Sequence, residues 1–337
     1  MPPPLDNLER ARIEPWRFET PPAFADEEPA ARAIGLELEF AGLTPRDAAA
    51  AARAALGGDL RQSGPLSAEI TGSAIGDVDF ELDMALTKLL RRDGGYDSAA
   101  AKIEDLLAEG VGEIARLIVP VEMVAPPLPL RRLTEIRPAF DALRKAGALG
   151  TGDATLYAFG MHLNIEAPSD AAEIVWRILS AYVLSEDWAL RAERPDWSRK
   201  LSPFITRYPT MFRIDVLETE TVADWPALVE AYLRRNPTRN RALDMLPLLA
   251  HHEHGRTEAL LGEAVKSPRP AFHYRLPDSR INEPDWSPAL SWEIWRRIER
   301  AAADADRLSA LREAMAARMD WMLDDEEHVA EIDRILS

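Results

Sequence analysis

The segment "IGLELEF", residues 34–40, places two carboxylates two positions apart within an apolar run. Because successive side chains of a strand point to opposite faces, Glu37 and Glu39 would share one face and the apolar side chains the other. Carboxylates on one face lie ~6.6 Å apart along a strand and can flank one or two divalent cations. A strand with a solvated outer face is the simpler alternative. The segment alone leaves both interpretations open.

Three later segments repeat this arrangement of polar groups opposite apolar ones. Glu122 lies in "VEMVAPP", and "YAFGMHLNIE" alternates His162 and Asn164 against apolar neighbours. The segment "RPAFHYRLPDSRIN" is predicted to be the last strand and contains His273 and Arg275. Taken singly, a histidine on a strand is more often a hydrogen-bonded structural residue than a ligand. Taken together, the segments predict one polar face shared by several strands.

The elements that must position these side chains follow from hydrophobic periodicity and from turn residues. Residues 67–84 predict a hairpin whose second strand has one apolar and one strongly acidic face. The Pro pair at 126–127 is expected to end the strand that contains Glu122. Helices are predicted over the remaining periodic segments: 44–57, 97–118, 131–146, 169–193, 222–235 and, as C-terminal helices, 284–336.

The alternation of apolar and polar residues decides the fold class. Strands of a doubly wound parallel sheet are apolar throughout, whereas these strands alternate, which indicates an antiparallel sheet with one covered face. We therefore expect an α+β protein with a mainly antiparallel sheet, one helix-covered face and one open face. The open face is the candidate active-site floor.

Composition restricts the possible functions. The 337-residue chain has a net charge of -17 and a pI near 4.9, and its Lys and Arg residues are scattered, which argues against a nucleic-acid partner. The absence of cysteine excludes disulfides, thiolate metal sites and a Cys nucleophile. No signal peptide and no membrane-spanning run is predicted, so a cytoplasmic location is expected.

Common catalytic motifs are absent. The chain has no Walker A loop, no G-x-G-x-x-G, no H-E-x-x-H and no G-x-S-x-G. The cluster "HHEHG", residues 251–255, suggests zinc, but histidines in a last helical turn before a Gly cap fit the helix dipole, which is the preferred interpretation. The Trp residues between 286 and 295 have helical spacing and are predicted to be core.

The strand motifs together resemble the glutamine synthetase and glutamate-cysteine ligase superfamily, and most closely its amidoligase branch. The resemblance extends over about residues 32–282 and rests on "GLELEF", "VEMVAPP" and "FGMHLNIE". It implies a glutamine-synthetase-like catalytic domain over residues 31–283. Residues 1–30 would be a Pro-rich arm, and residues 284–337 would be helices packed on the same domain.

The resemblance also implies a metal site. Glu37 and Glu39 match the family's first-strand G-x-E-x-E carboxylates, which hold the divalent cations that bridge ATP and substrate. Glu122 matches a strand carboxylate followed by a proline motif. His162 lies in the family's G-x-H strand and is implied as a metal or phosphate contact. Mg²⁺ prefers oxygen ligands, which suits these carboxylates, and Mn²⁺ is a possible substitute.

Further positions are implied to contact nucleotide or substrate. Asn164 is the companion of His162, and Asp83 lies where the branch has an Asp followed by Ser. Arg241 lies in "RNRALDMLPLL", where Asp244 replaces the family's Asn. His273 replaces a Glu of the terminal E-[FY]-R strand, which retains Arg275. Three arginines, Arg275, Arg207 and Arg213, are expected to stabilise the transferring phosphate or bind a substrate carboxylate. Neutralisation of the surplus acid is the alternative role for all three.

The implied reaction is ATP- and Mg²⁺-dependent joining of a carboxylate to an amine through an acyl phosphate. The expected partners are small-molecule or peptide carboxylates and amines, with no membrane or nucleic-acid partner, and an oligomer is possible. Two alternatives stay open. A metal-dependent hydrolase would use the same acidic face without nucleotide, and a noncatalytic scaffold would use the acids only as a solvated surface.

Overall fold

The computed structural model describes residues 16–24, 28–64, 66–82, 120–151, 159–195, 205–262, 265, 267–319 and 325–337. The predicted helix over residues 97–118 and the predicted site residue Asp83 lie outside these ranges. Among the described residues, an eight-stranded sheet in the order β2-β3-β4-β5-β1-β6-β8-β7 forms the centre of the molecule. Every pair of neighbouring strands is antiparallel. The expected α+β class and antiparallel sheet are therefore confirmed.

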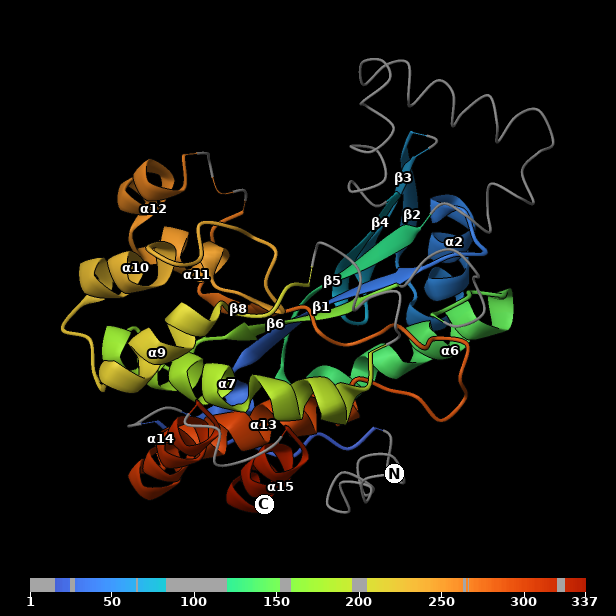
Figure 1. The fold of residues 1–337 in the computed structure, drawn as a ribbon. Helices are drawn as coiled ribbons and strands as arrows, with labels where there is room; N and C mark the ends of the chain where they lie inside the picture. The colour runs from blue at the N-terminus through green and yellow to red at the C-terminus, as the bar shows by residue number, and fades with distance from the viewer. Residues whose placement is uncertain are drawn as a thin grey trace, which may run out of the picture.

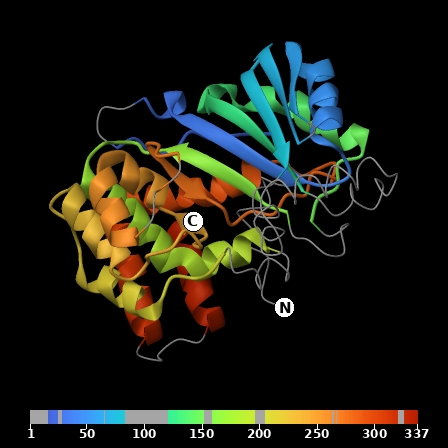
Figure 2. The same cartoon turned by 90° about the horizontal axis from the view of Figure 1, so that it is seen from above.

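The strands range from two residues in β7 to nine in β5. The helices lie at both ends of the sheet and beneath it (Figures 1 and 2). The strands are β1 Ala33–Phe40, β2 Asp59–Gly64, β3 Ser67–Ser73, β4 Gly76–Leu82, β5 Val121–Pro129, β6 Met161–Glu166, β7 Leu243–Asp244 and β8 Ala271–Tyr274. The α-helices are α2 Pro45–Leu56, α6 Arg137–Ala146, α7 Ala172–Glu193, α9 Thr210–Glu218, α10 Trp225–Leu233, α11 Leu246–His252, α12 His254–Leu261, α13 Ala289–Ala303, α14 Ala305–Met319 and α15 Asp325–Leu336. Two short 3₁₀ segments, η2 Pro29–Ala31 and η4 Leu130–Ile136, complete the described elements.

The first strand and helix form as their sequence predicts. Along β1 the apolar side chains are buried, whereas Glu37 and Glu39 are only partly buried on the other face. Helix α2 begins where Thr44 accepts a hydrogen bond from the backbone N–H of Asp47, with Pro45 in the first turn. The buried alanines of α2 then cover the apolar face of the hairpin β3–β4.

Helices cover the apolar face of the sheet at its other end too. Helix α7 is buried along most of its length, and α13 packs beside it beneath the sheet (Figure 1). Phe272 and Tyr274 of β8 contact the ring of Trp295 on α13 at 5.2 and 5.7 Å between centroids. Trp292 and Trp295 are buried, which confirms that they are core, and Trp286 is partly buried against that core. One face of the sheet is thus committed to packing, and the site residues project from the other.

Two predictions about where a strand or a helix ends are wrong. The pair Pro126 and Pro127 does not end β5, which continues to Pro129. This is possible because β4 pairs with β5 only as far as Val124, and the β1 pairing shifts register between Ile34 and Leu36, so the missing N–H groups disrupt no regular ladder.

The second wrong prediction is the helix end in the cluster "HHEHG". His251 and His252 form the last turn of α11, but the helix ends at Glu253, and Gly255 lies inside α12 instead of capping α11. The His252 ring stacks on Trp225 at 3.7 Å between centroids. Within the described residues, neither potential metal-binding group includes these histidines. None of the described helices has the length and apolar composition needed to cross a bilayer.

Candidate metal centre

Strand register brings predicted site residues of four strands together. Strand β1 lies between β5 and β6, with Glu39 opposite Glu122 and Glu37 opposite His162. On the far side of β6, Asn164 pairs with His273 of β8. Because paired residues on one face lie about 5 Å apart, side chains separated by more than 200 positions in the chain share one site.

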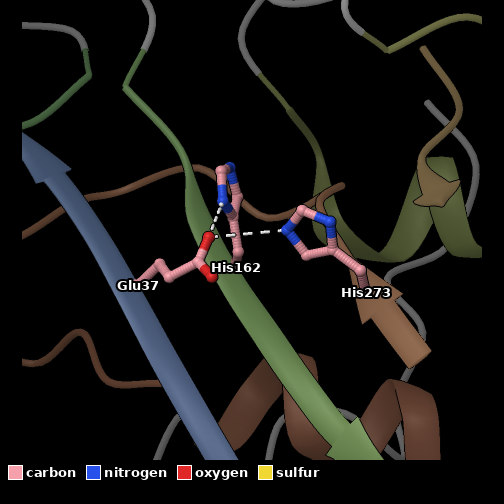
Figure 3. Close-up of side chains that lie close together, drawn as sticks. All are labelled: Glu37, His162 and His273. Atoms are coloured by element: carbon pink, nitrogen blue, oxygen red, sulfur yellow. Dashed lines mark hydrogen bonds and ion pairs between the residues drawn. The ribbon is translucent and has the colours of Figure 1, made fainter. Parts of the chain in front are cut away.

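Glu37 is the hub of this site. Its Oε2 lies 2.9 Å from Nδ1 of His162 and 3.5 Å from Nε2 of His273 (Figure 3). Its Oε1 accepts a hydrogen bond from Nδ2 of Asn164 at 2.8 Å and lies 3.5 Å from Nη2 of Arg269. The two carboxylate oxygens therefore have different partners: Oε1 contacts an amide and a guanidinium, and Oε2 faces two imidazoles.

Glu39 points to the other side of His162. Its Oε2 accepts a hydrogen bond from the backbone N–H of Gly160 at 2.6 Å, and its Oε1 lies 3.5 Å from Nε2 of His162. His162 thus stands between the two glutamates of β1, with one ring nitrogen facing each.

Burial and neighbouring charges set the protonation states. Burial lowers the pKa of His162, and the adjacent Glu37 and Glu39 only partly offset this effect. Burial would raise the pKa of Glu37, but interactions with His162 and His273 outweigh it and hold that pKa well below its ordinary value. Near neutral pH we therefore expect an ionised Glu37 beside a neutral His162, which can donate one N–H and offer one lone pair.

Two groups of side chains could each hold a metal ion. Glu39, Glu122 and His162 form an oxygen-rich group, and Glu37, His162 and His273 form a nitrogen-rich group. In each group the potential ligand atoms all lie within 4.8 Å of one another. All four residues predicted as metal ligands are in these groups, together with His273, which was predicted to contact nucleotide.

Further acids extend the site toward the hairpin. Glu81 lies opposite Glu122 across the β4–β5 ladder. Burial raises the pKa of Glu81, and the charges of Asp79 and Glu37 add to this effect. Burial and the charge of Asp77 likewise raise the pKa of Asp79. Like charges that raise one another's pKa are stabilised when a cation binds between them.

The predicted arginines have different environments. Arg275 follows β8 directly, donates from Nη1 to the backbone carbonyl of Arg239 at 3.1 Å, and contributes positive charge that lowers the pKa of both His162 and Asp244. Arg275 therefore lies close enough to His162 and Asp244 for its charge to act on both.

The other two predicted arginines are engaged beneath the sheet. Arg213 is buried, and its guanidinium binds Glu186 at 2.7 Å and Asp187 at 2.8 Å, both on α7. Arg207 is 60% exposed and lies 2.8 Å from Asp187. The structure thus groups both with the acids of α7, in agreement with the charge-neutralisation alternative, and does not bring Arg213 to the glutamates of β1.

Arg241 stabilises a loop. Its Nε donates to Asn236 at 3.0 Å, its Nη1 donates to the hydroxyl of Thr206 at 2.6 Å and to the carbonyl of Arg207 at 2.9 Å, and its guanidinium lies over the ring of Tyr208. These contacts account for its buried position without a ligand.

Arg269 is a site residue that the sequence analysis missed. Its Nε and Nη2 lie 3.0 and 2.5 Å from Oδ1 of Asn164, so it fixes the amide whose other end binds Glu37. Arg269 is the first residue of the segment "RPAFHYRLPDSRIN", which was predicted to be the last strand, and it has the same parity as His273 and Arg275. Alternation along that segment is therefore the signal that could have identified it.

Asp244 is a second partner of the centre. It is fully buried on β7, its Oδ2 lies 3.5 Å from Nδ1 of His273 and 3.4 Å from Nε of Arg239, and its Oδ1 accepts the backbone N–H of Leu246. Interactions with His273 and Arg239 outweigh burial and lower the pKa of Asp244. Asp244 is thus an ionised carboxylate behind the His273 ring.

Comparison with known proteins gives one match. A family model described as "Putative amidoligase enzyme" matches residues 30–296, which is most of the chain and includes the strands of every ligand named above. No curated protein and no solved structure gives a significant match.

Proposed function

The chain belongs to the amidoligase family, which confirms the resemblance of its strand motifs, and we propose that it is an ATP- and Mg²⁺-dependent carboxylate-amine ligase. Its substrates would be the carboxylate of an amino acid, peptide or other small molecule, and an amine. The observation that carries the proposal is the convergence of Glu37, Glu39, Glu122 and His162 on one face of the sheet within that family framework.

The oxygen-rich group of Glu39, Glu122 and His162 suits magnesium. Mg²⁺ prefers oxygen ligands, and Glu39 and Glu122 lie opposite each other on neighbouring strands with His162 close to both. The carboxylates of Glu39 and Glu122 would hold the ion, with His162 beside it. A bound magnesium–nucleotide complex supplies positive charge near the phosphate oxygens and reduces their repulsion for an attacking carboxylate.

The proposed ligase reaction has two steps. A carboxylate oxygen of the substrate forms a bond to the γ-phosphorus of ATP, and ADP leaves with the electron pair of the broken P–O bond. The amine nitrogen then bonds to the acyl carbon, phosphate leaves, and the nitrogen loses a proton. This scheme requires positively charged groups near the phosphates and carboxylates near the amine.

The two halves of the polar face meet these requirements. Arg275 and Arg269 lie on the β8 side and would bind phosphate or carboxylate oxygens. Glu81 and Asp79 lie on the β4 side, where a protonated amine would be attracted. The proposal therefore places the acid and nucleotide toward β8 and the amine toward β4.

One observation favours a second candidate. Two histidines and one carboxylate, as in Glu37, His162 and His273, are also the ligand set of hydrolytic zinc sites. A metal-dependent hydrolase would turn over without nucleotide, and this requirement separates the two functions.

The test uses hydroxylamine as a general amine. The full chain is incubated with ATP, Mg²⁺, hydroxylamine and pools of amino acids and small peptides, and ADP and hydroxamate are measured. We expect the two products in equal amounts from one pool, with turnover at least ~100-fold lower for Glu39→Gln. The control Glu173→Gln, an exposed acid at the start of α7, should match wild type. Hydroxamate formed without ATP would contradict the ligase.

A further inference from the structure

His273 has an unusual environment for a buried polar side chain. It is 5% exposed, and neither of its ring nitrogens makes a hydrogen bond. Its Nε2 is aimed at Oε2 of Glu37 from 3.5 Å, and its Nδ1 lies 3.5 Å from Oδ2 of Asp244 (Figure 3). Buried polar atoms without hydrogen bonds are rare, because each costs roughly 1–3 kcal/mol. A ligand bound between His273 and Glu37 would remove this cost.

The spacing of the three side chains suits a metal ion. Ligand atoms ~2.1 Å from a metal lie ~3.0 to 3.4 Å apart at octahedral or tetrahedral angles. The distances from Oε2 of Glu37 to the two rings, 2.9 Å for His162 and 3.5 Å for His273, are close to that range. The rings are 5.2 Å apart between centroids and nearly perpendicular, so both can direct an edge nitrogen at the carboxylate.

Neighbouring residues hold the three ligands in place. Oε1 of Glu37 is occupied by Asn164 and Arg269, which leaves Oε2 for an ion. Asp244 lies behind His273, on the Nδ1 side, and so favours Nδ1–H and a lone pair on Nε2. A carboxylate behind a ligand histidine is the common second partner in metal sites, where it fixes the ring and its tautomer.

We propose that Glu37, His162 and His273 bind a divalent transition metal of the zinc and cobalt class, with His273 as a direct ligand. This nitrogen-rich site differs in metal preference from the oxygen-rich group of Glu39 and Glu122. Imidazole nitrogen favours Zn²⁺ and Co²⁺, whereas Mg²⁺ is bound almost entirely through oxygen. The centre would then hold two different metals side by side.

His162 divides the two sites between its ring nitrogens. When a metal takes the lone pair of Nδ1, beside Glu37, the ring proton lies on Nε2 and faces Oε1 of Glu39 at 3.5 Å. The ion in the oxygen-rich group would then be held by the carboxylates of Glu39 and Glu122 without an imidazole. The inference rests on the proposed ligase function only for what the second metal does, and metal binding itself is tested without turnover.

The experiment titrates Co²⁺ into the metal-free full chain in the presence of excess Mg²⁺. Visible absorption reports the ligand field of Co²⁺, and calorimetry with Zn²⁺ gives the affinity. We expect one Co²⁺ per chain and a spectrum that excess Mg²⁺ does not remove. His273→Gln should weaken Co²⁺ binding by at least ~10-fold, because loss of a direct ligand costs at least as much as loss of its second partner.

Matched variants separate the two groups of ligands. Glu122→Gln should leave the Co²⁺ spectrum unchanged, because Glu122 belongs only to the oxygen-rich group. His273→Glu keeps a ligand but exchanges nitrogen for oxygen, so it should bind Co²⁺ more weakly and let Mg²⁺ compete. His254→Gln changes an exposed histidine on α12 and serves as the control. Circular dichroism of each variant checks the fold.

The outcomes distinguish this inference from the ligase proposal. A Co²⁺ spectrum that is the same in wild type and His273→Gln, or that Mg²⁺ abolishes, would overturn the nitrogen-rich site and leave ATP-dependent ligation untouched. A spectrum lost in His273→Gln, in a protein that forms no hydroxamate from ATP, would support the site and count against the ligase.

Discussion

Two groups of acids in this molecule are compensated in different ways. On α7, Glu186 and Asp187 are bound by Arg213 at 2.7 and 2.8 Å, and Arg318 lies 3.0 Å from Asp187. On β1, Oε2 of Glu37 and Oε1 of Glu39 face histidine rings. The α7 group is bound by fixed guanidinium groups, whereas the β1 group directs these oxygens at the ring of His162, whose pKa burial lowers. Arg269 lies 3.5 Å from the other oxygen of Glu37. The α7 acids therefore contribute to structure, and the β1 acids are suited to an exchangeable cation.

The first way to test this comparison is to remove the internal cation of the α7 group. Arg213→Ala leaves two buried carboxylates without their main partner, and loss of one member of a buried ion pair costs about 3–5 kcal/mol. Urea unfolding should show a decrease of that size in the free energy of unfolding. The exposed pair of Arg137 and Asp141, 3.5 Å apart, provides the control: Arg137→Ala should cost under ~1 kcal/mol. Equal losses in both variants would contradict the structural role of Arg213.

Removal of a β1 acid should do the opposite: it should change the free energy of unfolding little and lower the turnover strongly. Glu39→Gln keeps an oxygen that can accept the N–H of Gly160 and removes one of several neighbouring negative charges. We expect the free energy of unfolding in metal-free buffer to change by less than ~1 kcal/mol or to rise, since most substitutions outside the core have small effects. ATP-dependent turnover should fall at least ~100-fold. A large loss of stability would show that Glu39 is structural.

A third buried acid, Glu193, sharpens the comparison because protonation can neutralise it. Burial raises its pKa to about 7, although hydrogen bonds with Ser291 and Tyr274 act in the opposite direction. At pH values between 4.5, the ordinary pKa of a Glu, and about 7, the pKa of Glu193 in the folded protein, the folded state holds a proton that the unfolded state has lost. Stability therefore falls as pH rises through this window and is constant above it.

The variant Glu193→Gln isolates that effect. Tyr274 and Ser291 donate to different oxygens of Glu193. The amide oxygen of Gln can accept one of these hydrogen bonds and its NH2 can donate to the other hydroxyl, but the amide does not titrate. Between about pH 5 and about pH 8, wild type should lose about 2 kcal/mol more stability than the variant, as measured by urea unfolding. Parallel pH profiles for the two proteins would show that Glu193 has an ordinary pKa.

Local patterns predicted the faces of the strands well. The alternation along residues 34–40 and 76–82 placed Glu37, Glu39 and Asp79 on the polar face, and the structure places them there. The same reasoning predicted that His162 shares this face, because side-chain alternation depends only on the strand itself.

Contacts between distant segments were not predictable in the same way. Whether Arg213 faces α7 or the sheet depends on how α9 packs against α7, and no local pattern encodes that packing. Arg269 lies beside Asn164 because β8 pairs with β6, which depends on strand order. The role of His273 likewise required the position of Asp244 on β7.

The central claim is that the β1 acids bind a cation together with a nucleotide. Isothermal titration calorimetry of a nonhydrolysable ATP analogue, with and without Mg²⁺, tests it directly in wild type and Glu39→Gln. We predict saturable binding that requires Mg²⁺ in wild type and is lost in Glu39→Gln. Absence of binding in wild type under both conditions, or equal binding by the two proteins, would contradict the claim.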